Sequence, residues 1–234
     1  MKILAKGFNY SQDGPGNRLV YHLQGCNFAC RWCSNADMIP PDNPASRETG
    51  ADEVFDEIMR SRMMFFDGGG VTFTGGECTL YSDELLPLFR RLREEGISVC
   101  IETNASSPRL RELSEYVDFL IADLKIVDED RHRRMTGCSN RETLSNIAYF
   151  LDSGREIHIR IPLINGVNTD PCEFIDFLKR HDTSHADFEF LPYHEYGREK
   201  WGAEYEMRDA FITPETERRF KEEFEKNGLK TIKT

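Results

Sequence analysis

Apolar residues recur along the chain with two spacings, and segments of the two kinds follow one another in turn. Short runs rich in Val, Ile, Leu and Phe have the length and composition of buried strands. Longer stretches carry apolar residues three and four positions apart, which is typical of amphipathic helices. The predicted strands are 18–23, 70–74, 97–102, 118–124, 156–163 and 187–191, with an edge strand at 229–232. The predicted helices are 51–66, 82–95, 109–115, 141–153, 172–181 and 214–227.

Glycine and proline mark where these segments begin and end. Gly14 and Gly16 can adopt positive φ and Pro15 fixes its own φ, so residues 11–17 are expected to form a loop before the first strand. Gly228 follows the last helical stretch directly. It is expected to cap that helix at its C-terminus.

Strands that alternate with helices at this pace favour parallel pairing through right-handed crossovers. Six strand–helix units can be counted, whereas a complete barrel of this kind has eight. The pattern therefore predicts an α/β protein with a partial (β/α)6 barrel, in preference to a doubly wound sheet. A single domain spanning 1–234 is the simplest prediction, because the chain is long enough for one sizeable core.

Composition narrows the range of functions. No apolar run approaches the roughly 18 residues of a membrane span, and we expect a cytosolic protein whose thiols stay reduced. A formal net charge of −11 disfavours binding to nucleic acid and favours a protein or small-molecule partner. The basic run 131–134 is flanked by acids and is expected to be a solvated helix face.

Three cysteines stand close together in residues 24–35, which we call the cysteine loop. Cys26, Cys30 and Cys33 are spaced four and three apart, so one short loop can aim three thiolates at one point, as iron–sulfur ligation needs. Three ligands on a four-iron cluster leave one iron open for catalysis. Zinc, a disulfide and inert buried thiols are the alternatives. No second Cys-x-x-Cys pair is present to complete a zinc site, and seven cysteines without a signal peptide do not make a disulfide framework.

Polar residues follow, or end, each predicted strand. They are the cysteines, Gly75-Gly76-Glu77, Glu102-Thr103-Asn104, Asp123-Leu124-Lys125, Arg160 with Asn165-Gly166, and Pro192-Tyr193-His194. In a parallel barrel these positions share the rim on which active sites are built. Gly75 and Gly76 let the backbone approach a ligand closely, and Glu77 can accept from an ammonium group, although such triplets are more often plain turns.

Two other rim groups have both a ligand-binding and a structural interpretation. Asp123 and Lys125 lie two apart on a strand and so face the same side, where Lys125 could meet a carboxylate. The pair could equally be a salt bridge at the rim. His194 could contact a nucleoside, or it could be a structural histidine with satisfied hydrogen bonds.

The cysteine loop, with Trp32 just before its last cysteine, resembles the signature of radical S-adenosylmethionine (SAM) enzymes, whose core is a partial barrel. The resemblance narrows to the glycyl radical enzyme activating enzymes, in a short form without a cysteine-rich insert, and covers nearly the whole chain. The residues that carry it are Asp13-Gly14-Pro15-Gly16 with Arg18, the cysteine loop, Gly75-Gly76-Glu77, Asp123-Leu124-Lys125, 136–140, Ile159-Arg160, 191–197 and Lys200-Trp201.

The resemblance implies cofactors, partners and contacts. One [4Fe–4S] cluster would be held by Cys26, Cys30 and Cys33, with SAM chelated to the open iron. The contacts to SAM implied by the family, together with the rim residues above, are Trp32, Ser34, Gly75, Gly76, Glu77, Glu102, Asp123, Leu124, Lys125, Arg160 and His194. The implied partners are a glycyl radical enzyme, whose backbone glycine would lose a hydrogen atom, and an electron donor such as flavodoxin or ferredoxin.

Several positions depart from the family pattern. Ser34 stands in place of a histidine, and Glu102 replaces an aspartate that in the family lies near SAM and a monovalent cation. Cys78 and Cys138 replace apolar residues. They are expected to be small buried hydrophobes, as are Cys100 and Cys172.

Two other functions stay open on the sequence alone. A radical SAM enzyme for a small molecule, resembling 7-carboxy-7-deazaguanine synthase, would act without a protein partner. A non-enzymatic iron–sulfur or zinc module would not cleave SAM.

Overall fold

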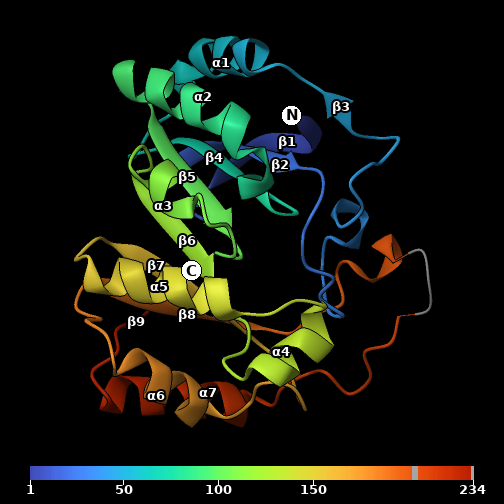
Figure 1. Ribbon diagram of the computed structural model, residues 1–234, viewed down its shortest axis with the longest axis vertical. Coiled ribbons are helices and arrows are strands. Elements are labelled where there is room, and N and C mark those ends of the chain that lie inside the picture. Colours follow the sequence, from blue (N-terminus) through green and yellow to red (C-terminus); the bar gives the residue numbers. More distant parts are fainter. Residues whose placement is uncertain (202–204, 233–234) are drawn as a thin grey trace. The chain divides into compact units, whose positions relative to one another are not determined.

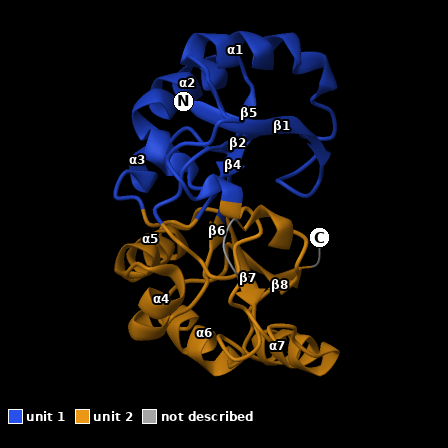
Figure 2. Ribbon diagram, turned by 90° about the vertical axis from the view of Figure 1, so that its right-hand side faces the viewer, with its two compact units in different colours: residues 1–27, 37–103, 107–121 blue, residues 28–36, 104–106, 122–234 orange. Residues whose placement is uncertain are grey.

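The computed structural model describes residues 1–201 and 205–232 of the chain. These residues form two compact units, each made of several chain segments (Figure 2). Unit 1 comprises 1–27, 37–103 and 107–121, and unit 2 comprises 28–36, 104–106 and 122–234. The single domain expected from the sequence stays a prediction. Among the described residues no helix has both the length and the apolar character needed to cross a membrane.

The sheet of unit 1 contains five strands in the order β3-β1-β2-β4-β5. They are β1 (Lys2–Tyr10), β2 (Asn17–Leu23), β3 (Arg47–Glu48), β4 (Gly70–Gly75) and β5 (Ser98–Thr103). β1 pairs antiparallel with β2 and β3, whereas β2, β4 and β5 are parallel. A further strand, β6 (Phe119–Asp123), crosses the boundary between the two units along the chain. The parallel strands therefore end at one edge of the sheet, where the predicted rim residues of this unit follow.

Three helices of unit 1 pack through apolar faces. They are α1 (Ala51–Arg60), α2 (Ser82–Glu94) and α3 (Leu110–Ser114), with short 3-10 turns at Arg62–Met64 and Cys78–Tyr81. A further 3-10 turn, Ala36–Met38, begins at the last residue of the unit 2 segment 28–36. α1 and α2 lie side by side (Figure 1). Leu85, Phe89 and Leu92 of α2 are fully buried, and the Arg91 guanidinium lies 4.0 Å from the ring centroid of Phe55 in α1. Apolar burial and this cation–π contact fix the helix pair.

Unit 2 carries parallel strands β7 (Ile157–Leu163), β8 (Ala186–Pro192) and β9 (Thr231–Ile232). Its helices are α4 (Glu129–Thr136), α5 (Arg141–Asp152), α6 (Pro171–Leu178) and α7 (Pro214–Lys226), with a 3-10 turn at Arg198–Lys200. α6 and α7 each begin with proline after a capping side chain, Asp170 and Thr213. Phe188 and Phe190 of β8 make edge-to-face contacts with Phe224 of α7, at 5.4 and 4.9 Å between ring centroids.

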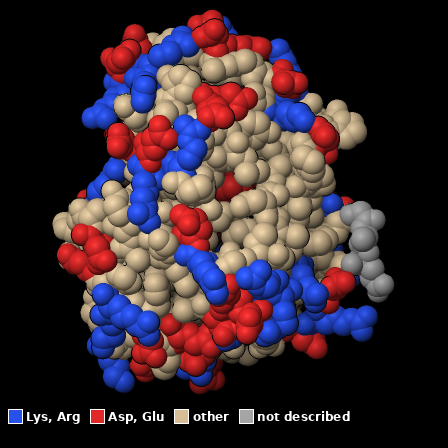
Figure 3. Space-filling view, viewed as in Figure 1, with Lys and Arg blue, Asp and Glu red and all other residues tan. Residues whose placement is uncertain are grey.

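The outer face of α7 is strongly charged. Figure 3 shows Lys, Arg, Asp and Glu side chains crowded at the lower end of the view, over α6 and α7. On α7 the charges form pairs three or four residues apart, such as Arg218 with Glu215 and Lys226 with Glu223. Each exposed pair contributes only about 0.3–0.5 kcal/mol, so this face serves solubility more than stability.

Most predicted segments are confirmed within a few residues. Gly228 caps α7 at φ 78°, with Leu229 N donating to Phe224 O at 3.0 Å. The predicted helix 51–66 is too long, because it ends at Arg60 and continues as a 3-10 turn. Strand β1 was not predicted, since most of its side chains are exposed and no buried face gives it a periodic signal.

The buried role expected for four cysteines holds for two of them. Cys78 and Cys100 are fully buried, and burial raises the pKa of the Cys78 thiol well above its ordinary value. Cys138 is half-buried and Cys172 is exposed, so the expectation was wrong for Cys172. Cys172 follows Pro171 at the start of α6, on the exposed side of a turn whose Pro171 and Phe174 are buried. The basic run 131–134 does lie on a helix, but His132 within it is buried.

Candidate active site

The part of the cysteine loop that lies in unit 2 is held by backbone hydrogen bonds. Ala29 N donates to Thr136 O at 2.7 Å and Arg31 N donates to Met135 O at 3.1 Å. Cys33 N donates to Cys30 O at 3.0 Å, which closes a turn between the two cysteines. Cys30 is therefore bracketed by two bonds to the end of α4. The backbone N–H groups of Ala29, Arg31 and Cys33 lie in a loop, but each has a hydrogen-bond acceptor, as in a helix or strand.

The surroundings of Cys30 and Cys33 favour thiolates. Asn35 N points at Cys33 Sγ at 3.3 Å, and Trp201 Nε1 donates to Cys33 O at 3.0 Å. The ammonium group of Lys125 interacts electrostatically with both thiols. All seven cysteines are free of disulfides. A cluster that needs deprotonated sulfur ligands fits this donor set, because a nearby cation and a backbone N–H both stabilise negative sulfur.

Lys125 and Asp123 form an ion pair just beyond the end of β6, with 2.5 Å between Nζ and Oδ2. Burial by itself would lower the pKa of Lys125, but the charges of Asp123, Cys30 and Cys33 outweigh it and raise the pKa. Lys125 thus stays a cation although its side chain is only 14% exposed. Asp123 and Lys125 face the same side, as predicted. They also form the salt bridge that was the structural interpretation of this pair.

Other predicted contact residues of unit 2 lie just after β6, within β7 or in the cysteine loop. Leu124 N donates to Arg160 O at 2.9 Å, and Arg160 Nε donates to Glu189 Oε2 at 2.8 Å. Trp32 is buried, and Ser34 is half-buried. A Cβ on Gly197 would lie 1.9 Å from Ser34 O, so only glycine fits there. The segment 191–197 thus approaches the cysteine loop through its backbone.

His194 stacks on Tyr196, with 4.4 Å between ring centroids and 24° between ring planes. Tyr196 N lies 3.4 Å from His194 Nδ1 and donates to it. Since Nδ1 accepts, the neutral ring carries its proton on Nε2. Tyr196 itself is 85% exposed. The ring pair is a flat, largely apolar surface of the kind on which a nucleoside can stack.

In unit 1 the two glycines at the end of β4, Gly75 and Gly76, permit close backbone packing. Gly76 N donates to Leu23 O at 2.9 Å, Glu77 N donates to Gly25 O at 2.8 Å, and Cys26 N donates to Ile39 O at 3.1 Å. A Cβ on Gly76 would lie 2.1 Å from Gly25 O. The Gly75-Gly76 pair therefore supports the first part of the cysteine loop, in addition to any contact with a ligand.

Glu77 is turned into the protein. It is 1% exposed, and its Oε1 accepts from Thr79 N, Thr79 Oγ1 and Thr103 Oγ1 at 3.0, 2.6 and 2.7 Å. This arrangement caps the 3-10 turn Cys78–Tyr81. Glu102 Oε2 accepts from Thr74 Oγ1 at 2.9 Å. The ligand-binding roles of both glutamates stay predictions.

The motif Asp13–Gly16 has a structural function in unit 1. Arg18 is fully buried, and its guanidinium donates to Thr72 Oγ1 and Val71 O at 2.8 Å each. Thr72 Oγ1 in turn donates to Asp13 O at 2.6 Å. The buried charge is thus satisfied by hydrogen bonds, with electrostatic contributions from Asp118 and Asp13, and it ties the loop to the start of β2 and β4.

Sequence reasoning missed three polar side chains of unit 2: His132 and Glu189, which are buried, and His158, which is half-buried. His158 Nε2 lies 2.9 Å from Glu189 Oε2, next to Arg160. The sequence signal for His158 and Glu189 is an i, i+2 spacing of polar residues within two strands, whereas His132 stands in the basic run 131–134. In the part of the chain that the structure describes, no three His, Cys, Asp or Glu side chains stand together as a preformed metal-ion site. Cys26 belongs to unit 1 and Cys30 and Cys33 to unit 2, so their shared ligand role stays a prediction.

Comparison with known proteins identifies the class. Residues 20–178 match the model of the radical SAM superfamily, and the chain belongs to that superfamily. Among its relatives, the pyruvate formate-lyase-activating enzyme of Staphylococcus aureus (strain USA300) is 35% identical over 213 residues, which cover 85% of this chain and 84% of that protein. The membership predicted from the cysteine loop is confirmed.

Solved structures agree on the fold. A domain of a pyruvate-formate lyase-activating enzyme from Bacteroides vulgatus ATCC 8482 superposes with a TM-score of 0.60 at 28% identity, over 70% of this chain and 98% of that one. A radical SAM methyltransferase from Sphaerobacter thermophilus gives a TM-score of 0.69 at 17% identity, over 96% of this chain and 67% of that one. The predicted fold class, a partial (β/α)6 barrel of the radical SAM type, is confirmed.

Proposed function

We propose that this chain is a glycyl radical enzyme activating enzyme. The observation that carries the proposal is its 35% identity, over 85% of its length, to a pyruvate formate-lyase-activating enzyme. When bound, a [4Fe–4S] cluster and SAM supply, after one-electron reduction, a 5′-deoxyadenosyl radical that takes a hydrogen atom from a backbone glycine of the partner enzyme. The partner would be a glycyl radical enzyme, and flavodoxin or ferredoxin is the electron donor that the family favours.

The protein's own residues would bind the cluster and orient SAM. Cys26, Cys30 and Cys33 would hold three irons of the cluster. Lys125, kept cationic by Asp123, is suited to a carboxylate such as that of the methionine moiety. The ring pair of His194 and Tyr196 offers a stacking surface for the adenine. The reduced thiols that such a site needs agree with a cytoplasmic location.

Three predicted contacts add to this set. Gly76 would present backbone groups to SAM, and Arg160, held by Glu189, would add a second cation in unit 2. Glu102, where the family has aspartate, would stand near SAM and a monovalent cation. Measuring SAM affinity with and without K⁺ tests the last point directly.

The function is tested by forming the radical. The reconstituted, reduced protein is mixed with SAM and the glycyl radical enzyme encoded beside it, and a glycine-centred EPR doublet is expected. Cys30→Ala is the matched control and should give neither the doublet nor SAM cleavage. SAM cleavage without a doublet on any partner would overturn the protein-activating function in favour of a small-molecule substrate. No cleavage at all, or zinc in place of roughly four irons per chain, would exclude a radical SAM enzyme.

A further inference from the structure

The end of α4 and the cysteine loop complete each other's hydrogen bonds. The last carbonyl groups of a helix have no partner inside it. In unit 2 two of them, Met135 O and Thr136 O, accept from Arg31 N and Ala29 N at 3.1 and 2.7 Å. The two donors flank Cys30 in the sequence. The position of Cys30 therefore depends on where the last turn of α4 stands.

His132 fixes that last turn. Its side chain is buried, and its Nδ1 lies 2.7 Å from Cys138 O, which can only accept, so Nδ1 carries the proton. Between these two residues Gly137 adopts φ 81° and reverses the chain. The Thr136 hydroxyl donates to His132 O at 2.9 Å. The imidazole of His132 therefore stabilises the turn next to Met135 O and Thr136 O, the two carbonyl groups that accept from the cysteine loop.

The same imidazole touches the cysteine loop directly. The ring of Phe28 packs edge-on against the ring of His132, with 5.1 Å between centroids and 76° between planes. Phe28 is 3% exposed. Burial lowers the pKa of His132, so the ring is neutral at pH 7 and its apolar edge suits an aromatic neighbour.

We propose that His132 is a positioning residue for the cluster ligand Cys30. It does not touch the cluster. It holds the turn 136–138 and supports Phe28, so that α4 keeps the backbone on both sides of Cys30 in place. The inference rests on the proposed function, because it assumes a cluster at the cysteines. Residues that orient metal ligands in this indirect way typically change metal affinity 10–100-fold when they are replaced.

The test compares His132→Phe with His132→Asn in the reconstituted holoprotein. Phenylalanine keeps the ring contact but removes the donor, whereas the Asn amide can place an N–H where Nδ1 stands. Bleaching of the cluster by an iron chelator should be about ten-fold faster in His132→Phe and within two-fold of the unchanged protein in His132→Asn. The EPR spectrum of the reduced cluster should broaden in His132→Phe alone. Hydrogen exchange of a peptide spanning 28–33 should accelerate in that variant even without the cluster.

Leu151→Ala is the matched control, because Leu151 is buried in α5 of the same unit. It should lower stability without changing the bleaching rate or the exchange of 28–33. Wild-type bleaching and exchange in His132→Phe, or equal effects in Leu151→Ala, would overturn the positioning role and leave the proposed function standing. Failure of the unchanged protein to take up iron would instead overturn both. If His132→Phe does not fold, Thr136→Val takes its place, because it removes the hydroxyl that donates to His132 O. Its cluster should also bleach faster than that of the unchanged protein, and an unchanged bleaching rate in Thr136→Val would refute the inference.

Discussion

The ammonium group of Lys125 lies 2.5 Å from Oδ2 of Asp123, at the point where β6 ends. Both groups come from one short segment, and the cation is mostly buried while the carboxylate is about one-third exposed. The charges of Asp123, Cys30 and Cys33 outweigh the desolvation of the ammonium group and hold Lys125 as a cation. A ligand carboxylate can therefore form a charge-assisted contact with it.

Replacing Lys125 by alanine should therefore weaken SAM binding. The loss of one charge-assisted hydrogen bond corresponds to about 2 kcal/mol, or roughly 30-fold in Kd. Isothermal titration calorimetry of the reconstituted protein measures the Kd for SAM. Lys230→Ala, which removes an exposed cation of the same unit, should leave the affinity unchanged. Unchanged binding in Lys125→Ala would limit Lys125 to its structural ion pair.

Cys30→Ala should abolish the cluster, whereas Cys138→Ala should retain it. Cys30 faces the Lys125 charge, whereas Cys138 contributes to its surroundings mainly through its backbone carbonyl. Iron content and visible absorption after anaerobic reconstitution distinguish the two variants. A full complement of iron in Cys30→Ala would refute the ligand assignment.

Gly76→Ala should destabilise unit 1. The added Cβ would lie 2.1 Å from Gly25 O and 2.7 Å from Met38 O, and both obstacles are backbone atoms that cannot rotate away. We expect a loss of at least about 1–3 kcal/mol in the free energy of unfolding, measured with urea. Gly7→Ala meets nothing within 4 Å and should change it by less than about 0.5 kcal/mol. Equal stabilities of the two variants would contradict the close approach.

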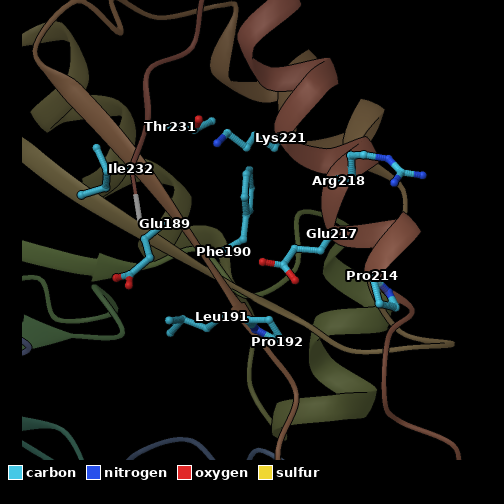
Figure 4. Close-up of a pocket in the computed structure, with 10 residues that line it drawn as sticks. All are labelled: Glu189, Phe190, Leu191, Pro192, Pro214, Glu217, Arg218, Lys221, Thr231 and Ile232. Atoms are coloured by element: carbon cyan, nitrogen blue, oxygen red, sulfur yellow. The ribbon is translucent and has the colours of Figure 1, made fainter. Parts of the chain in front are cut away.

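The contribution of His158 to stability should depend on pH. His158 lies between Asp187 and Glu189 on β8. Glu189 and Phe190 are among the residues that line a pocket of about 620 Å³ (Figure 4). Burial would lower the pKa of His158, but the hydrogen bonds to the two carboxylates outweigh it and raise the pKa above its ordinary 6.5. A raised pKa means that the contribution is fully present below about pH 6.5 and is lost as the pH rises through the raised value.

The comparison of the unchanged protein with His158→Gln measures this contribution. The difference in free energy of unfolding should be about 1–3 kcal/mol near pH 5.5 and should shrink toward pH 9. It should also shrink in acid, because the pKa values of Asp187 and Glu189 are lowered from 3.8 and 4.5 and the carboxylates lose their charge there. A difference that grows with pH would show that His158 is neutral in the folded protein.

Local features could be predicted from the sequence because they depend on neighbours in the chain. A few adjacent residues set the spacing of the three cysteines, the glycine pair Gly75-Gly76 and the Asp123–Lys125 pair. Hydrophobic periodicity located the α-helices and strands of the described residues except β1, β3 and α4. The same residues identified the superfamily, since the cysteine loop is one uninterrupted segment. Strand β1 was not predicted, because it is stabilised by pairing with β2 and has no buried face of its own.

Only the tertiary structure decided which distant residues meet. The register of β7 and β8 sets His158 opposite Asp187 and Arg160 opposite Glu189, and register follows from backbone hydrogen bonds along both strands rather than from either sequence alone. Likewise, the turn after α4 supports a cysteine loop about a hundred residues earlier in the chain. The sequence by itself determined which groups could hold a cluster. The folded chain decided which backbone atoms keep Cys30 in place, because unpaired helix carbonyls and loop N–H groups find partners only when the segments pack together.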